Sequence, residues 1–405
     1  MKSITSKLKF LAIAGIAFAS AIAIHSCSKS SSSTPAAKPT VSSVTTGSSD
    51  TAGKSSIVTI TGANLSGASL STTATGVTFS NVTASSTSIT ATITVTASTS
   101  SGSITVTITT SAGSTTTTVT IVGLTPLGGF ISSDSVEPAA LITYFPFNGN
   151  VNDTVGNQTG TAVGVTYTAG IRGQAYQGAS GAYATVPASS ALKSLTSYSV
   201  SVWYNLPTAV KPSTTGPAQG MFFLSGDSTG SSGNYLILET DVPSASQLAA
   251  DSVPIHHGFD NLGGVAGSWQ NFTMNSFDTA TSNWVHVVMT YDGGSSTYVF
   301  YENGQPIAVS SAYGTSTSTT LYDGPLPVGS GTPPTQLMGN LNFSPAVSPA
   351  STIFIGAWPP GLYGVSPTLG ANGDFQGALD ELRVYNIALK PTDVVGLYLN
   401  GLAGR

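Results

Sequence analysis

Five segments between residues 56 and 122 alternate Thr or Ser with apolar, mostly β-branched residues. They read SIVTITG, GVTFSNV, SITATITVTA, GSITVTITT and TTTTVTIV. A period of two places apolar side chains on one face of a strand and hydroxyls on the other, which is typical of half-buried strands. Glycines and serine clusters separate the segments at the spacing of a sandwich. The pattern predicts a small all-β sandwich over residues 39–123.

The aromatic residues gather in the later part of the chain, where every Trp lies beyond residue 200. The segments YSVSVWYN, SNWVHVVMTYDG, STYVFYENGQPI and TIFIGA again favour strands. We therefore expect a second, larger β-domain over residues 141–405. The stretch 124–140 contains Pro and Gly and is expected to be a linker.

Two family resemblances refine this all-β prediction. The motifs PTVSSV, VTITGANLSGA, GVTFSN and GSITVTITTSAG resemble an IPT/TIG domain, which implies an immunoglobulin-like spacer, with an unspecialised β-spacer as the alternative. The motifs ALITYFPFNGNVNDTVGNQTGTAVG and FQGALDELRVYNIALKPTDVVGLY resemble a bacterial concanavalin A-like, laminin G type (LamG) jelly roll. That second resemblance implies two antiparallel sheets packed face to face, with the first and last strands side by side.

Residues 1–26 carry three lysines followed by an apolar run from Phe10 to Ile24. This pattern predicts a secretory signal, because the run is too short for a spanning helix of about 20 residues. Cys27 follows directly and is the only cysteine. The stretch resembles a bacterial lipobox, which implies that Cys27 is acylated and anchored in outer-membrane lipid, on the periplasmic face or at the cell surface. An ordinary cleavage site with an incidental cysteine is the alternative. Residues 27–38 then form a Ser/Pro tether.

The charged residues argue against two classes of function. The formal net charge is -5, so the surface repels phosphate backbones and a nucleic-acid partner is not expected. Glycoside hydrolysis needs two carboxyl groups flanking one bond. Asp380 and Glu381 are adjacent and would point to opposite faces of a strand. No pair of carboxyl groups facing one cleft can be assembled from the sequence, so we predict that the protein is not an enzyme.

Several side chains are candidates for glycan binding. Aromatic residues among Gly and Pro are expected on loops, where a ring can stack on a sugar, although rings that seal the sandwich ends are the alternative. The segment PIHHGFDN is expected to be a surface loop, either plain or in contact with sugar, with a metal site as the less favoured alternative. Trp203, Trp284 and His286 are expected to pack in the core. The predicted ligand-binding residues are Trp269, Trp358, Tyr363, His256, His257 and Asp260.

The stretch FPFNGNVNDTVGN holds four Asn and one Asp between glycines. The laminin G resemblance implies a structural calcium ion at the rim, bound by Asp153 and Asp380, with Asn148, Asn150 and Asn157 as further oxygen donors. Asn148 stands where the family usually has Asp, which removes one negative charge. A cluster of Asx turns, in which these side chains cap their own backbone, is the alternative.

Together these features predict a non-catalytic, lipid-anchored protein that binds a polysaccharide with loops of its second domain. Adhesion or structural contact with other surface proteins is the alternative function. Glycoside hydrolysis is the least favoured. Aromatic rings along an open groove would favour glycan binding, whereas rings buried under the sheet ends would favour a structural role.

Overall fold

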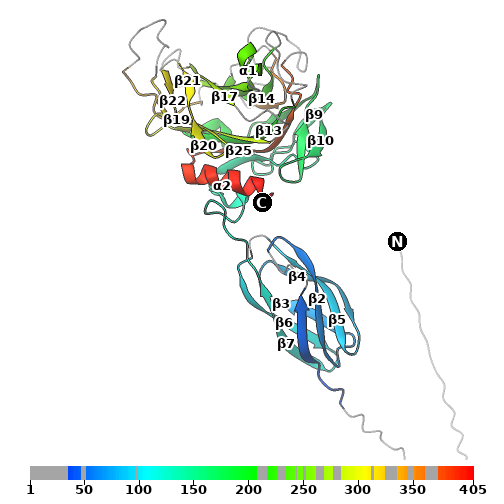
Figure 1. Ribbon diagram of the computed structural model, residues 1–405. Coiled ribbons are helices and arrows are strands. Elements are labelled where there is room, and N and C mark those ends of the chain that lie inside the picture. The colour runs from blue at the N-terminus through cyan, green and yellow to red at the C-terminus, as the bar shows by residue number, and fades with distance from the viewer. Residues whose placement is uncertain are drawn as a thin grey trace, which may run out of the picture.

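The computed structural model shows two β-domains in one chain (Figure 1). Cys27 and Tyr363 lie outside the residues it describes, as do the side chains of Asp260 and Trp269. The described residues are 35–46, 52–96, 99–207, 217–226, 234–242, 244–249, 252–260, 269–276, 284–311, 314–323, 335–343, 351–360 and 373–405. The all-β prediction is confirmed: every sheet is antiparallel, apart from one isolated parallel bridge between Gly220 and Asp374. Within these residues no helix is long and apolar enough to cross a membrane.

The N-terminal domain is a sandwich of two sheets with the orders β1-β2-β5-β4 and β3-β6-β7. Val58, Ile60, Ile93, Val106 and Ile108 are fully buried in the core between them. All five predicted segments form strands here, as the period of two requires. The strands are β1 (Thr40–Thr46), β2 (Ser55–Ala63), β3 (Ser69–Thr72), β4 (Val77–Ala84), β5 (Ser88–Val95), β6 (Gly102–Thr110) and β7 (Gly113–Ile121).

Hydroxyl groups cover the outer faces of this sandwich. The outward Ser and Thr side chains of neighbouring strands pair across the sheets, as at Ser55–Thr94 and Thr109–Ser114, both with 2.9 Å between the oxygens. Such cross-strand pairs each contribute a few tenths of a kcal/mol, to about 1 kcal/mol at most. The faces therefore combine strand-forming side chains with an uncharged polar surface.

In its described residues the second domain consists of two nine-stranded sheets packed face to face. One sheet, here the helix-covered sheet, has the order β10-β11-β25-β13-β18-β19-β20, with β8 beside β25 and β23 beside β19. Its strands are β8 (Leu141–Phe145), β10 (Thr166–Ala169), β11 (Gln174–Gln177), β13 (Tyr198–Asn205), β18 (Val285–Asp292), β19 (Thr297–Glu302), β20 (Gln305–Ile307), β23 (Thr319–Thr320) and β25 (Ala378–Tyr385).

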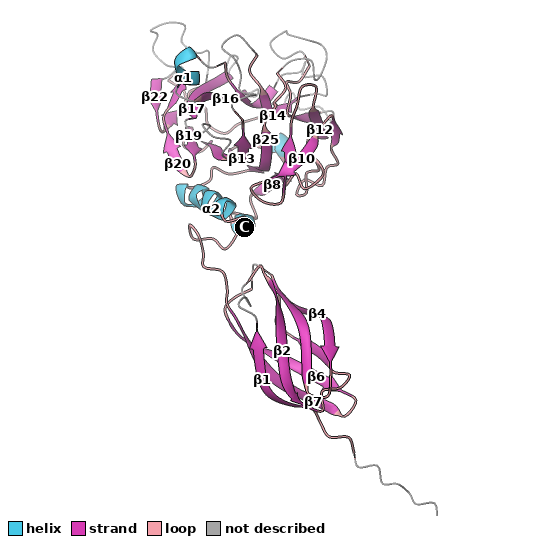
Figure 2. Cartoon of the chain, turned by 45° about the vertical axis from the view of Figure 1, so that its right-hand side comes forward, coloured by secondary structure: helices cyan, strands magenta, loops and turns pink. Residues whose placement is uncertain are grey.

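The opposite sheet, here the cavity sheet, has the order β22-β21-β17-β16-β15-β14-β24-β12-β9. Both sheets are drawn above the N-terminal sandwich in Figure 2. The strands of the cavity sheet are β9 (Thr161–Val163), β12 (Tyr183–Pro187), β14 (Gly220–Ser225), β15 (Asn234–Thr240), β16 (Val253–Asp260), β17 (Trp269–Ser276), β21 (Val309–Ser311), β22 (Gly314–Ser316) and β24 (Thr352–Ile355).

The first and last strands of this domain pair, as the laminin G resemblance implies. Strand β8 lies antiparallel to β25, with Tyr144 opposite Arg383 and Phe145 opposite Leu382. Strand β25 also contains a bulge, because Trp203 of β13 faces Asp380 whereas Ser201 faces Arg383. Two residues of β25, Glu381 and Leu382, therefore lie opposite the single residue Val202 of β13. The φ of Glu381 is 53°, in the left-handed region. The bulge changes which way the side chains near Glu381 point.

Helix α2 (Pro391–Leu402) covers the outer face of the helix-covered sheet. Pro391 occupies its first turn, where the missing N–H costs nothing, and the Asp393 carboxylate accepts a hydrogen bond from the Lys390 N–H at 2.9 Å. The buried Val394 and Leu397 pack into a small core with Tyr301 and other residues of this sheet. The other helical segments are η1 (Ser133–Ser135), η2 (Leu192–Ser194) and α1 (Ala245–Ala249).

The stretch between the domains lies against the second domain in its later part. The Asn400 side chain donates to the carbonyls of Leu127 and Phe130, at 3.0 and 3.3 Å. Ser133 donates to the Arg405 carbonyl through both its N–H, at 3.0 Å, and its hydroxyl, at 2.7 Å. These contacts tie residues 127–133 of the expected linker to helix α2 and the residues that follow it.

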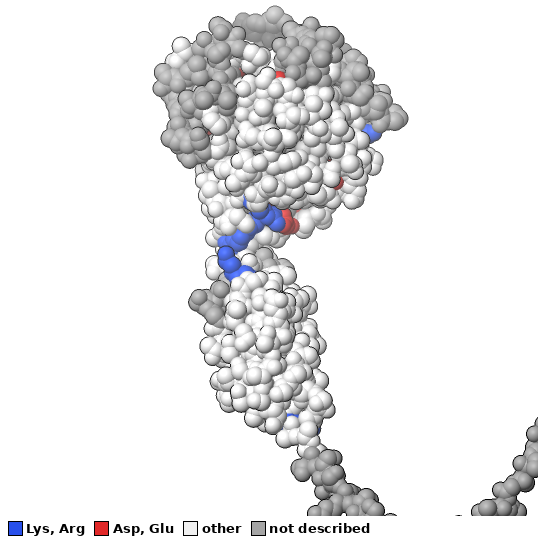
Figure 3. All heavy atoms as spheres, turned by 90° about the vertical axis from the view of Figure 1, so that its right-hand side faces the viewer, with Lys and Arg blue, Asp and Glu red and all other residues white. Residues whose placement is uncertain are grey.

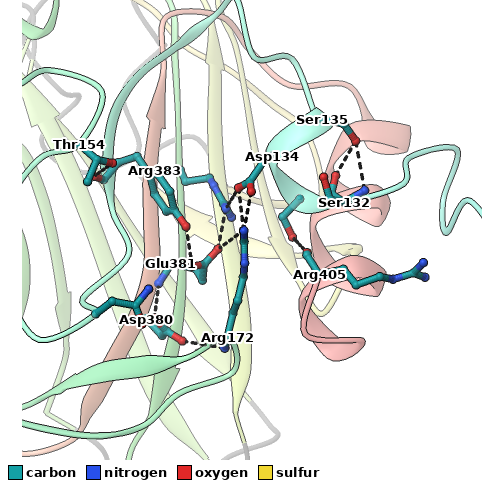
Figure 4. Close-up of polar contacts among 12 residues, drawn as sticks. Ser132, Asp134, Ser135, Thr154, Arg172, Asp380, Glu381, Arg383 and Arg405 are labelled. Atoms are coloured by element: carbon teal, nitrogen blue, oxygen red, sulfur yellow. Dashed lines mark hydrogen bonds and ion pairs between the residues drawn. The ribbon is translucent and has the colours of Figure 1, made fainter. Parts of the chain in front are cut away.

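An ion-pair network holds η1 to the helix-covered sheet (Figure 4). Both guanidinium nitrogens of Arg172 donate to the Asp134 carboxylate, at 2.7 and 2.5 Å. Arg383, which is fully buried, donates to Asp134 at 2.9 Å and to Glu381 at 2.5 Å. The Arg383 guanidinium also lies 4.4 Å from the Tyr144 ring centre, and the Tyr144 hydroxyl donates to Glu381 at 2.6 Å. The buried charges are thus compensated, as burial requires.

Candidate functional site

A polar patch lies beside a small apolar cluster on the outer face of the cavity sheet. On β15 and β16, Leu238, Ile255 and His257 point into the core, so their neighbours Glu239 and His256 point to the opposite face. The register places Glu239 opposite His256, and His256 opposite Thr273 of β17. Asn271 lies two residues before Thr273 and points to the same face. Three adjacent strands therefore present polar side chains at one place.

His256 is held between two oxygen acceptors. Its Nδ1 lies 2.7 Å from the Glu239 Oε1, and its Nε2 contacts the Asn271 Oδ1. His256 and Glu239 are both buried, with 7% and 2% of their surfaces exposed. With the Asn271 amide in this orientation both partner atoms accept hydrogen bonds, an arrangement that favours the imidazolium form, in which both ring nitrogens donate.

The surroundings of His256 support this charge. Burial by itself lowers the pKa of His256, but the hydrogen bond and negative charge of Glu239, together with Asn271, raise that pKa above its ordinary value. A protonated His256 forms with the Glu239 carboxylate a buried ion pair whose charges cancel. Such a pair fixes the orientation of both side chains, which is a requirement for a selective site.

Trp358 lies beside this pair, on the segment after β24. Its indole is partly exposed and packs on Phe223, Ile237 and Phe354, which form a small apolar cluster on this outer face. Gly373 makes room for the ring: a Cβ at this position would lie 2.4 Å from the indole, and its φ of 67° also favours glycine. The backbone is thus shaped around the indole.

The indole and the polar patch line one cavity of about 380 Å³. This volume lies within the range of small-molecule sites, and the combination of an aromatic face with a few converging polar groups is typical of them. The described lining residues are Pro217, Ala218, Glu239, Asp241, Val242, His256, Asn271, Thr273 and Trp358. Two of the predicted ligand-binding residues, His256 and Trp358, therefore meet in one cavity.

The structure also brings two carboxyl groups to this cavity. Glu239 and Asp241 are two residues apart, and both line it. The expectation that no two carboxyl groups share a cleft is therefore wrong. The expectation was based on the adjacent pair Asp380 and Glu381. It did not take account of the i, i+2 spacing of Glu239 and Asp241, which puts two side chains on one face of an extended chain.

The expectation of a surface loop at PIHHGFDN is also wrong, because residues 254–260 lie in β16 inside the sheet. His257 is buried in the core, with the hydroxyls of Tyr198 and Tyr298 at 3.4 and 3.2 Å from its two ring nitrogens. Burial, together with the charge of His256, lowers the pKa of His257 to about 3, so this imidazole stays neutral. His257 therefore packs in the core, on the face of β16 opposite the cavity.

Other aromatic residues fall in strands as well. The backbone of Trp269, which was expected on a loop, begins β17, opposite Asp260 of β16. Trp203 is buried and stacks on His286 with 4.8 Å between ring centres, as the packing prediction requires. The Trp284 indole is only partly buried.

Asp153, one predicted calcium ligand, caps the opening loop. Its buried Oδ1 accepts hydrogen bonds from the N–H groups of Tyr144, Val155 and Gly156, at 2.9, 3.1 and 2.8 Å. This arrangement is an Asx turn extended to the neighbouring strand. The side-chain amides of Asn150 and Asn157 likewise donate to carbonyls two residues away, both at 3.3 Å.

Asp380 and Asn148 share a different turn. The Asp380 Oδ2 accepts the Arg172 N–H at 3.1 Å, and the Asn148 Oδ1 accepts the Gln174 N–H at 2.7 Å. Burial raises the pKa of Asp380 to about 7, although the backbone hydrogen bonds from Arg172, Glu381 and Ile171 lower it. Asp153 and Asp380 thus hold separate backbone segments. In the described part of the chain no three His, Cys, Asp or Glu residues cluster as metal ligands. Calcium binding by this loop stays a prediction.

Comparison with known proteins bears on the domain that carries the cavity. Residues 178–341 match the family model described as "Concanavalin A-like lectin/glucanases superfamily". The second domain is concanavalin A-like. Most of the described cavity lining, including the Glu239–His256 pair, lies inside the matched residues, whereas Trp358 lies beyond them. No curated protein matches the chain.

Solved structures similar to the chain share little sequence with it. A heptameric SAP-like pentraxin from Limulus polyphemus is 15% identical, with a TM-score of 0.28 and coverage of 50% of this chain and 70% of the pentraxin. A candidate carbohydrate binding protein from Bacteroides ovatus is 12% identical, with a TM-score of 0.30 and coverage of 87% and 77%. A Trypanosoma rangeli sialidase bound to sialic acid is 14% identical, with a TM-score of 0.39 and coverage of 88% of this chain but only 52% of the sialidase. Scores this low carry no conclusion about the concanavalin A-like domain.

Proposed function

We propose that the protein binds a carbohydrate, without cleaving it, in the cavity of the cavity sheet. The observation that supports this proposal is the meeting of the Trp358 indole with the ordered polar group of Glu239, His256 and Asn271. A sugar has an apolar C–H face and a rim of hydroxyls, and it needs both kinds of partner. The lectin/glucanase description of residues 178–341 is consistent with that ligand class.

The proposal extends to the placement of the site. A chain acylated at Cys27 would hold the cavity away from the outer membrane, beyond the tether and the N-terminal sandwich. A polysaccharide outside the membrane would then be the partner. Contact with other surface proteins is the alternative use of the same domain.

Hydrolysis is the second candidate, because Glu239 and Asp241 line one cavity. Glu239, however, is hydrogen-bonded to His256, and a proton donor for a leaving group must be free to transfer its proton. Binding without cleavage is therefore the first candidate. A hydrolase would release reducing ends from a bound polysaccharide, whereas a binding protein would leave it intact.

A glycan array tests the proposal. Trp358→Ala should weaken binding of any captured glycan about tenfold or more, because aromatic anchors of this kind dominate binding energies. The matched control is Trp284→Ala, which removes a partly buried indole outside the described cavity lining. Equal loss in both variants, or capture of no glycan by the parent protein, would contradict the proposal. The calcium prediction is tested by adding a chelator. If calcium is bound, the chelator should lower the melting temperature of the protein or its binding to glycans on the array.

A further inference from the structure

The charges around the cavity bear on which class of glycan it accepts. Glu239 and Asp241 are its acidic lining residues, and His256 is the single basic residue in the described lining. Since Glu239 and His256 compensate each other at 2.7 Å, the remaining charge is the carboxylate of Asp241. An anionic ligand would find no free cation among these side chains and would meet one uncompensated negative charge.

The surrounding sequence strengthens this charge pattern. Between residues 194 and 382, which include the cavity strands β14 to β17 and β24, Lys211 is the only Lys or Arg. Twelve acidic residues lie in the same stretch. The two arginines nearest to it in sequence, Arg172 and Arg383, are both engaged in the network with Asp134 on the opposite sheet.

Recognition of anionic sugars requires cations. Carboxylate, sulfate and phosphate groups are bound by the fork of Arg or by Lys, and juxtaposed like charges cost several kcal/mol in a buried site. Uncharged sugars have the opposite requirement, because their hydroxyls donate hydrogen bonds to carboxylates. The Asp241 carboxylate can accept hydrogen bonds from sugar hydroxyls, and the Asn271 amide can donate or accept them. The Trp358 ring can stack on the C–H face of a sugar.

We infer that the ligand is an uncharged glycan and that the cavity discriminates against sialylated, uronic acid-containing and sulfated glycans. This inference rests on the proposed carbohydrate binding and narrows its ligand class. The discrimination comes from Asp241 and from the neutralised Glu239–His256 pair. It therefore belongs to the same cavity that Trp358 lines.

Paired glycans that differ only by a negative charge provide the test. Suitable pairs are the methyl ester of sialyllactose with sialyllactose itself, and fully methyl-esterified homogalacturonan with its de-esterified form, all measured against the full-length protein by calorimetry or on an array. The uncharged member of a bound pair should bind at least tenfold more tightly. Asp241→Asn should lower the ratio of the two affinities, because the charged member is then repelled less strongly.

Two control variants test whether the affinity ratio depends on Asp241 in particular. Lys211→Gln, which removes the single Lys or Arg of this stretch, and Asp292→Asn, which removes a carboxylate outside the described lining, should both leave the ratio unchanged. Tighter binding of the charged members would overturn the inference while leaving carbohydrate binding intact. Binding of neither member of any pair, nor of any other array glycan, would overturn the proposed function itself.

Discussion

At the scale of single residues, buried histidines decide how the second domain responds to acid. His286 is buried, stacks on Trp203, and has its Nε2 2.9 Å from the Ser201 hydroxyl. Burial, with the charge of Arg383, lowers the pKa of His286 to about 3. The folded domain therefore keeps this imidazole neutral over a pH range in which the unfolded chain protonates it.

The sign of the pH effect follows from this difference. Because the pKa in the folded state is lower, His286 stabilises the fold fully above the unfolded pKa of about 6.5, and that stability is lost as the pH falls from 6.5 toward 3. At pH 5 the loss is about 2 kcal/mol for one such histidine. His257 should behave in the same way, whereas His256, whose pKa is raised, stabilises the fold at low pH.

His286→Gln tests this linkage. The glutamine can still hydrogen-bond Ser201 but takes up no proton, so the difference in unfolding free energy between pH 7.5 and pH 5 should shrink by about 2 kcal/mol. Urea unfolding followed by tryptophan fluorescence reports on the second domain alone, because all four Trp lie in it. An unchanged pH difference in the variant would show that His286 is protonated in the folded state.

At the scale of elements, the 3-10 turn η1 is fastened to the helix-covered sheet by one carboxylate. Asp134 receives hydrogen bonds from both Arg172 and the buried Arg383. Asp134→Asn removes the negative charge between them and leaves Arg383 with Glu381 as its remaining charged partner in the network. We expect a loss of about 1 to 2 kcal/mol in unfolding free energy, less than for a fully buried charged hydrogen bond because about half of the Asp134 side chain is exposed.

Limited proteolysis shows whether that loss is local. Cleavage within residues 127–140 should become faster in Asp134→Asn, because the segment detaches more often from the sheet and from α2. Asp292→Asn is the control, since in the described part of the chain the Asp292 carboxylate accepts hydrogen bonds from Gly294 and Ser295 of its own turn. Cleavage at the parent rate would mean that the contacts of Asn400 and Ser133 suffice to hold the segment.

The sequence predicted strands of the helix-covered sheet and also β24, but it missed several strands of the cavity sheet. The segments YSVSVWYN and STYVFYENGQPI became β13 and the hairpin β19–β20. Strand β14, GMFFLS, is buried on both faces and shows no alternation, and the segment that became β16 contains Pro and Gly. Apolar outer-face residues such as Phe223 remove the pattern on which the prediction depends.

The candidate site was predictable only in part for a related reason. His256 and Trp358 were identified by residue type, but Glu239, Asp241 and Asn271 were not. These residues come from different strands and meet because the sheet order places β15, β16 and β17 side by side. The E-x-D spacing of Glu239 and Asp241 was a signal in the sequence that could have identified the carboxyl pair.

At the scale of the whole molecule, charge is sparse on the face shown in Figure 3, where basic and acidic side chains gather at the junction of the two domains. A cavity of about 700 Å³ at this junction is lined by Lys54 of the N-terminal sandwich and by Asp134, Arg172 and Arg405 of the second domain and the segment leading to it. The two domains have separate apolar cores. The junction is therefore polar, as in many interfaces between domains that fold independently.

The predicted anchor belongs to this scale too. Cys27→Ser should move the protein from the membrane fraction to the soluble fraction of cells and abolish incorporation of labelled fatty acid, because the acyl chains provide the membrane affinity. Ser28→Ala is the matched control, since it changes the neighbouring hydroxyl and keeps the thiol. A Cys27→Ser variant that stays with the membrane would contradict lipid anchoring.

The strands of the N-terminal sandwich run along its long axis, so the chain enters at one end and leaves at the other (Figure 1). Nine-residue strands such as β7 give this spacer a length of about 30 Å. Copies anchored side by side would present their cavities at a common height, and a long polymer could occupy several of them at once. Each further cavity then binds at a high effective concentration, so residence time depends on the number of copies engaged. For such an array, a cavity that holds a single sugar weakly is sufficient for durable capture.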